Sequence, residues 1–210
     1  MKLTWIGHSC FKVEKDGYRI VIDPYQDDSV PGLAPVREEA ELVLCTHEHG
    51  DHNGRECVTV SESAESPFRI TQLETFHDDA KGQLRGVTRM YILDDGEQKI
   101  AHLGDIGCPL TEEQIRALSG LDVLLLPVGG YYTIDAKEAA GVAELLKPRL
   151  VVPMHFRDDQ VGFGYDVIGT VREFTDLRAG SVSVRQECTL DTARDDLEET
   201  VVLKPQNCRQ

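Results

Sequence analysis

Short apolar runs, separated by turn residues, dominate the first half of the chain and predict β-strands. The adjacent apolar residues Val21 and Ile22 predict a strand buried on both faces, whereas the alternation over 68–76 predicts one polar face. Residues 26–40 are rich in Asp, Pro and Gly, which predicts a loop at the rim of a site. We expect strands over 2–8, 10–14, 18–23, 42–46, 58–60, 68–76, 87–93 and 99–103, with a short helix or turn between 53 and 66.

The second half of the chain alternates apolar runs with helical patterns. Residues 121–128 are almost wholly apolar, which predicts a strand covered on both faces. Asp135 is placed to cap a helix over 136–146, and Pro148 ends it because proline cannot continue a helix. We further expect helices over 111–118 and 165–177, and strands over 150–152, 182–184 and 200–203.

The order of these elements indicates two sheets packed together with helices outside. Periodicity alone leaves the class open between α/β and α+β. A chain of 210 residues suits one domain, and no linker, low-complexity segment or composition shift divides it. We therefore expect a single domain over 1–210.

A cluster of metal-ligand side chains follows the apolar run 42–44. His47, His49, Asp51 and His52 lie within six positions, and His and Asp are ligands that divalent zinc, manganese or iron accept. Residues i and i+2 of an extended segment project to the same side, so the first two histidines can bind one cation. The last two residues follow a turn at Gly50 and can reach a second cation. A polar surface loop is the alternative, but burying this cluster without partners would be costly.

The segment from Thr46 to His52 resembles the signature T-H-x-H-x-D-H of the metallo-β-lactamase superfamily at every fixed position. The resemblance covers nearly the whole chain and implies an α+β fold, the four-layer αββα sandwich. A small bacterial subgroup of metal-dependent hydrolases related to ascorbate-6-phosphate lactonase is similar in five further segments, namely 7–9, 22–24, 104–105, 127–130 and 153–156.

The superfamily order of ligands implies a dinuclear centre. On this resemblance His47, His49 and His77 bind the first metal, Asp51, His52 and His155 bind the second, and Asp105 bridges the two. Two such cations would generate a bridging hydroxide near neutral pH, because metal binding lowers the pKa of water from 15.7 toward about 7. Asp51 is the catalytic carboxylate of this scheme. Zinc fits the His-rich set best, and manganese or iron can use the same positions.

Other polar residues near predicted strand ends are candidates for supporting roles. Asp23 is expected to accept a hydrogen bond from a ligand imidazole and fix its tautomer. His8 is placed to support the ligands or contact substrate, although a structural role is equally compatible, and His102 is expected to be a core residue. The candidate substrate contacts, each of which is otherwise a typical surface residue, are Lys81, Arg85, Tyr131, Tyr132 and Arg157.

Charge, hydropathy and cysteine usage indicate which partners and which cellular compartment suit this chain. The net charge of −15 and the lack of a basic cluster disfavour nucleic acid and anionic membranes as partners, and so disfavour a nuclease. No apolar run is long enough to span a membrane, and the N-terminus lacks the pattern of a signal peptide. The six cysteines are scattered without a Cys-x-x-Cys pair, which is typical of free thiols in a cytoplasmic protein.

The sequence therefore favours a hydrolase that acts on a small ester, lactone or phosphoester through two metal ions. The alternative is a metal-binding or scaffold protein of the same fold that is catalytically silent. Self-association into a homo-oligomer is left open by the sequence.

Overall fold

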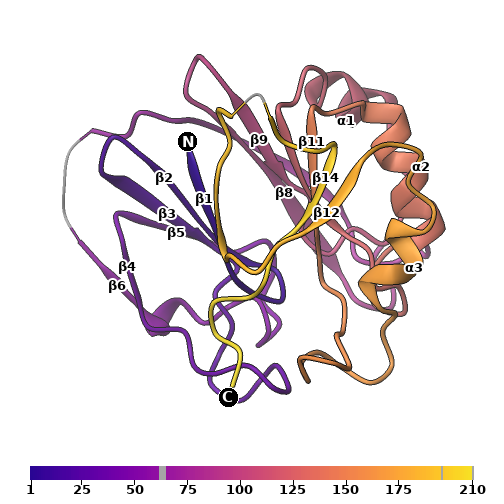
Figure 1. Cartoon of the computed structure of the whole chain (residues 1–210), viewed down its shortest axis with the longest axis horizontal. Helices are drawn as coiled ribbons and strands as arrows, with labels where there is room; N and C mark the ends of the chain where they lie inside the picture. The colour runs from indigo at the N-terminus through magenta and orange to yellow at the C-terminus, as the bar shows by residue number, and fades with distance from the viewer. Residues whose placement is uncertain (62–64, 195, 210) are drawn as a thin grey trace.

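Two β-sheets packed face to face form the body of the protein (Figure 1). The computed structural model describes residues 1–61, 65–194 and 196–209. One sheet has five strands in the order β13-β1-β2-β3-β5, and the other has seven in the order β12-β14-β11-β10-β9-β8-β7. No helix in these described ranges is long and apolar enough to cross a bilayer.

The five-stranded sheet begins with the antiparallel meander expected from the sequence. Its strands are β1 (Lys2–Gly7), β2 (Cys10–Lys15) and β3 (Tyr18–Ile22), followed in parallel by β5 (Leu42–Leu44). The C-terminal segment adds β13 (Thr189–Asp191), which pairs with β1 and which the sequence pattern did not predict.

The seven-stranded sheet combines an antiparallel half with a parallel half. β7 (Arg69–Phe76), β8 (Val87–Asp94) and β9 (Lys99–His102) are antiparallel neighbours. The parallel half continues from β9 through β10 (Val123–Pro127), β11 (Leu150–Met154), β14 (Thr200–Val202) and β12 (Val182–Val184). Strands β7, β9, β10 and β11 consequently run in the same direction, so their carboxyl ends share one edge of the sheet.

A short third sheet corrects one sequence expectation. Residues 26–40 were expected to be loop throughout, but β4 (Glu38–Ala40) pairs in parallel with β6 (Val58–Val60). Ala40 is fully buried, which explains why this segment is ordered as a strand despite its acidic residues. The 3₁₀ helix η1 (Arg55–Cys57) precedes β6, and residues 62–64 of the expected 53–66 segment lie outside the described residues.

The described part of the chain has three α-helices, and Figure 1 shows them on the outer side of the seven-stranded sheet. They are α1 (Glu112–Ala117), α2 (Ala136–Leu146) and α3 (Val171–Thr175), each with a capping box at its N-terminus. The prediction of a helix over 165–177 is wrong for residues 165–170, because α3 begins at Val171. The backbone N–H of Gly169 donates to the Gly129 carbonyl at 2.6 Å, so the helix begins only after the cap at Thr170.

The core lies between the sheets and around β10. All five residues of β10 are buried, as the apolar run predicted, and each buried leucine contributes roughly 1.5–3 kcal/mol. Trp5 of the five-stranded sheet packs against Phe156, which follows β11, with ring centroids 5.3 Å apart. This contact between the sheets lies close to the carboxyl ends of β1 and β11. Packing of the core therefore fixes the position of one sheet relative to the other at this edge.

One ion pair ties the start of β5 to β3 and gives a test of the fold. The carboxylate of Glu41 accepts from the backbone N–H of Arg19 at 2.6 Å and from its guanidinium at 2.8 and 3.2 Å. These hydrogen bonds lower the pKa of Glu41 from 4.5 to about 2. The stabilisation is therefore complete above about pH 4.5 and is lost as the pH falls toward 2.

We expect Glu41→Gln to lower the free energy of unfolding by about 1–2 kcal/mol at pH 7. The difference from the native chain should shrink as the pH falls below 4.5, and urea denaturation at several pH values measures it. Glu97→Gln is the control, because Glu97 is exposed in its pair with Lys15 and should change stability by less than about 0.5 kcal/mol. Equal loss in both variants would contradict the prediction.

Candidate metal centre

Seven His and Asp side chains converge where strands of both sheets end. The segment that holds His47, His49, Asp51 and His52 follows β5 of the five-stranded sheet. The remaining three residues follow strands of the seven-stranded sheet, namely His77 after β7, Asp105 after β9 and His155 after β11. These strands run in the same direction, so the structure brings together all seven residues that the sequence singled out as metal ligands.

Asp105 lies at the middle of the cluster. Its Oδ2 atom is 3.1 Å from His155 Nε2, 3.2 Å from His52 Nε2 and 3.4 Å from His77 Nε2. A fourth imidazole, that of His47, has its Nε2 at 4.0 Å. One buried carboxylate oxygen therefore faces imidazoles of both predicted ligand sets.

The donor atoms of the described residues fall into three overlapping groups that could each hold a metal ion, one of which joins His47, His52 and Asp105. Those of His47, His49 and His77 lie within 4.8 Å of one another. A second group holds Asp51, His52 and His155 and also includes His8, for which the sequence had suggested a supporting role, a substrate contact or a structural role. Histidines of both of these groups face Asp105.

Several of these buried atoms have no hydrogen-bond partner among the described residues. They include the Nε2 atoms of His47, His52 and His155 and the Oδ1 atom of Asp105. Leaving such atoms unpaired costs about 1–3 kcal/mol each, so native proteins avoid it unless a ligand satisfies them. Imidazole nitrogens and a carboxylate that face one point form a donor set that fits divalent cations. The cluster is therefore able to bind metal.

Hydrogen bonds behind the cluster fix the tautomers of two histidines. Asp23 is fully buried and accepts from Thr46 N, Thr46 Oγ1 and His52 Nδ1, each at 2.7 Å. Since the Thr46 hydroxyl donates to Asp23, it accepts from Nδ1 of His47 at 3.0 Å. The imidazoles of His47 and His52 thus each hold a proton on Nδ1, and their Nε2 atoms are directed at the cluster. Asp23 occupies the place that the sequence suggested for it.

The charges within the cluster are strongly coupled. Burial alone would lower the pKa of His52, but Asp105, Asp51 and Asp23 raise it well above its ordinary value. Burial and the nearby His52 lower the pKa of His47 to about 3. Burial would raise the pKa of Asp105, but His155 and His52 hold it well below the usual range. A proton on His52 is therefore favoured, whereas His47 stays neutral and Asp105 stays ionised.

A cavity of 270 Å³ opens onto the cluster and contains some of the expected substrate contacts. Its lining includes His49, Asp51, His77 and Asp105 together with Arg85, Tyr132 and Tyr165. The Arg85 guanidinium lies over the Tyr132 ring, 5.6 Å from its centroid. Tyr165 was not singled out from the sequence, because it lies in the segment that was expected to be helical.

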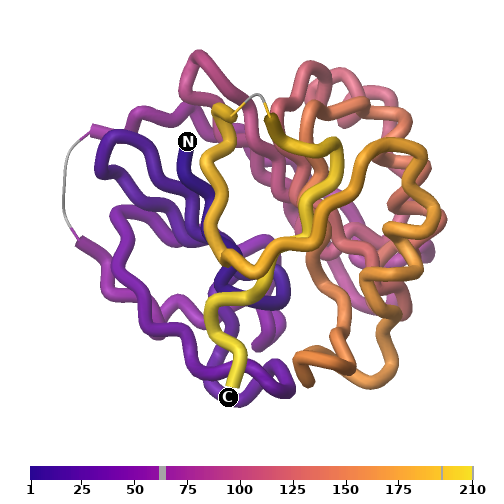
Figure 2. Tube along the Cα trace, in the orientation of Figure 1, coloured from indigo at the N-terminus to yellow at the C-terminus, as the bar shows by residue number. Residues whose placement is uncertain are grey.

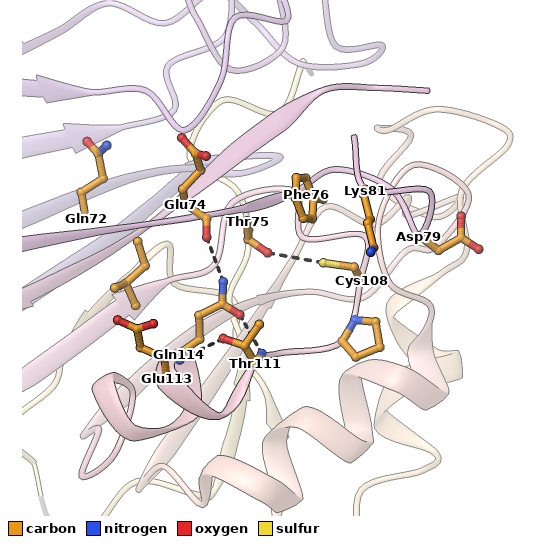
Figure 3. A pocket seen from close by; sticks show the side chains of 12 residues that line it. Gln72, Glu74, Thr75, Phe76, Asp79, Lys81, Cys108, Thr111, Glu113 and Gln114 are labelled. Carbon is orange, nitrogen blue, oxygen red and sulfur yellow. Dashed lines mark hydrogen bonds between the residues drawn. The ribbon is translucent and has the colours of Figure 1, made fainter. Parts of the chain in front are cut away.

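Three other candidate substrate contacts lie elsewhere. Lys81 lines a separate cavity of 580 Å³ between β7 and α1, which Figure 3 shows, with Cys108 and Thr75 on its wall. Tyr131 is 63% exposed and is not part of the lining of the metal cavity. The Arg157 side chain donates to the Ile168 carbonyl at 2.7 Å and pairs with Asp159.

His102 is the satisfied core residue that the sequence suggested, since it contacts the Ser9 carbonyl and the Gly104 N–H.

Comparison with known proteins agrees with this geometry. The family model of the β-lactamase superfamily domain matches residues 2–155. A metal-dependent hydrolase from Thermococcus onnurineus is 32% identical over 190 residues, which cover 74% of this chain and 84% of that protein. Another from Methanopyrus kandleri is 30% identical over 193 residues, with coverage of 74% and 84%.

A solved structure extends the agreement to the fold. The crystal structure of a Thermotoga maritima protein of the metallo-β-lactamase superfamily is 31% identical in sequence, with a TM-score of 0.75. The likeness covers 96% of this chain and 97% of that one. It confirms the α+β sandwich expected from the sequence, and the family match includes all seven residues of the cluster. The chain therefore belongs to the metallo-β-lactamase superfamily and is a metal-dependent hydrolase.

Proposed function

We propose that this hydrolase uses two metal ions to cleave a small ester, lactone or phosphoester. The observation that carries the proposal is the position of Asp105, whose Oδ2 atom lies 3.1 to 4.0 Å from imidazoles of both donor groups. A carboxylate so placed can hold two cations close together. The cavity of 270 Å³ lies just below the range of about 300–1,000 Å³ that is usual for ligand sites, which favours a small substrate.

The donor set suits zinc best, since imidazole nitrogens outnumber carboxylates, and manganese or iron are the alternatives. A bound pair of divalent cations would lower the pKa of water toward about 7 and polarise a carbonyl or phosphoryl oxygen. Cations of total charge +4 would exceed the charge of −2 on Asp51 and Asp105, so the centre would attract an electron-rich substrate group.

The residues of the chain have distinct parts in this scheme. Asp51, the proposed catalytic carboxylate, is kept ionised: burial would raise its pKa, but the nearby imidazoles of His52 and His8 lower it. Asp23 holds the Nδ1 proton of His52, so that Nε2 is left free to bind. Arg85 contributes the positive side chain to the cavity lining, and we propose that Arg85 and Tyr132 orient the substrate.

The first test of this proposal is metal content together with hydrolysis. We expect about two divalent ions per chain, and turnover of generic lactone and phosphodiester substrates that a chelator abolishes and added metal restores. In Asp51→Asn a neutral ligand replaces an anionic one, so one ion should be held about 10–100-fold more weakly and turnover should fall. Hydrolysis that is indifferent to chelation would contradict the proposal, and bound metal without turnover of any substrate would indicate a silent metal-binding protein.

The second test addresses Asp23, which lies behind the ligands. In Asp23→Asn the amide has one acceptor oxygen for three donors, so the His52 proton is no longer held on Nδ1. We expect metal affinity to fall about 10–100-fold, as measured by competition with a chromophoric chelator. Asp122→Asn is the matched control, because Asp122 accepts from Lys99 N at 2.8 Å near the amino end of β10, away from the cluster. Unchanged affinity in Asp23→Asn would refute the assigned role.

A further inference from the structure

His8 lies within the second donor group. Its Nε2 atom is 3.3 Å from Asp51 Oδ2, and the donor atoms of His8, Asp51, His52 and His155 all lie within 4.8 Å of one another. The side chain is fully buried, and its ring centroid is 4.2 Å from that of His155 and 5.4 Å from that of His52. The imidazole of His8 is therefore as close to the presumed ligands as they are to each other.

The backbone places this ring in the cluster at some cost. His8 follows β1, whose register shifts between Trp5 and Gly7, and it has a φ of 53°, which is unfavourable for a residue other than glycine. Its carbonyl accepts from the indole N–H of Trp5 at 2.9 Å and from the N–H of His155 at 3.4 Å. These two hydrogen bonds hold the strained turn in place, and through His155 they connect the two sheets.

The hydrogen bonds of His8 differ from those of the residues that support the cluster. Asp23 accepts from a backbone N–H and from two side chains, and His102 has hydrogen bonds with two backbone groups. Among the described residues, the ring of His8 has a hydrogen bond only with Asp51, and its Nδ1 atom is buried without a partner. Asp51 is itself a presumed ligand. His8 thus has the contacts of a member of the donor group.

The spacing of the donors agrees with a shared cation. Two ligand atoms bound at about 2.0–2.2 Å to one cation lie roughly 3–4.4 Å apart, depending on the angle between the bonds. The separations of Asp51 Oδ2 from His8 Nε2 and from His52 Nε2, 3.3 and 3.7 Å, both fall in this range.

We propose that His8 is a direct ligand of the second metal ion, together with Asp51, His52, His155 and the shared Asp105. This inference rests on the two-metal centre proposed above. Five protein donors exceed the four that structural zinc sites use, so the second position would favour a cation that accepts five or six ligands, such as Mn²⁺, Fe²⁺ or Co²⁺. The two positions of the centre would then differ in metal preference.

Titration of the metal-free protein with Co²⁺ tests the proposal, because the visible absorption of Co²⁺ becomes stronger as its coordination number falls from six to four. His8→Gln retains an N–H donor for Asp51, whereas His8→Ala removes it. In both variants we expect the second equivalent of Co²⁺ to bind at least about 10-fold more weakly, and its visible band to become more intense. His102→Gln is the control, because it removes an equally buried imidazole that belongs to none of the donor groups, and its second band should match that of the native protein.

The possible outcomes distinguish the role of His8 from the existence of the two-metal centre. If the native protein binds two equivalents and His8→Gln matches it in affinity and spectrum while His8→Ala does not, His8 only donates a hydrogen bond to Asp51, and the proposal is overturned. If all variants match the native protein, it is overturned as well. If the native protein binds fewer than two equivalents, the two-metal centre itself is refuted. Far-UV circular dichroism of each variant checks that the chain is folded.

Discussion

The meeting of four imidazoles around one buried carboxylate is the constraint on which the rest of the structure depends. Asp105 is 1% exposed, and a carboxylate this deeply buried must be matched by positive charge or hydrogen bonds. The nearby imidazoles of His52 and His155 supply part of that match and hold the pKa of Asp105 low. A divalent cation on each side would supply more. The negative charge of Asp105 is thus balanced only while the surrounding residues hold these positive groups close to it.

Neither sheet contains the site alone. The five-stranded sheet contributes His8, Asp23 and the segment 47–52, while the seven-stranded sheet contributes His77, Asp105 and His155. The two halves meet only when the core between the sheets is packed. In Figure 2 the trace shows how the C-terminal segment passes from the helical side across to the first strands, where β13 pairs with β1. The chemistry therefore depends on long-range packing, and a disturbance of the core would shift one half of the donor set against the other.

The sequence predicted the local parts of this arrangement better than the long-range ones. The segment 46–52 is contiguous, so its residue types and spacing alone indicate metal binding, and the apolar runs place β10 and β11 within a few residues. Three-dimensional neighbours were harder to find. Tyr165 lines the cavity, and it precedes α3 because the N–H of Gly169 donates a hydrogen bond to the Gly129 carbonyl and the helix begins only after it. The apolar periodicity of the sequence does not predict this hydrogen bond. The side chains of Lys81 and Arg157 lie away from the metal cavity because loop direction is set by tertiary contacts.

The charge of the centre links metal binding to folding. Asp23, Asp51 and Asp105 surround His52, and their charges overcome burial to raise the pKa of that imidazole well above its ordinary value. A cation that binds Nε2 of His52 must displace any proton held there, so binding releases protons and becomes stronger as the pH rises. Since the unfolded chain does not bring the two sheets together, binding energy is gained only in the folded state and adds to its stability. The same residues that would perform hydrolysis would thus allow a bound metal to help hold the two sheets together at this edge.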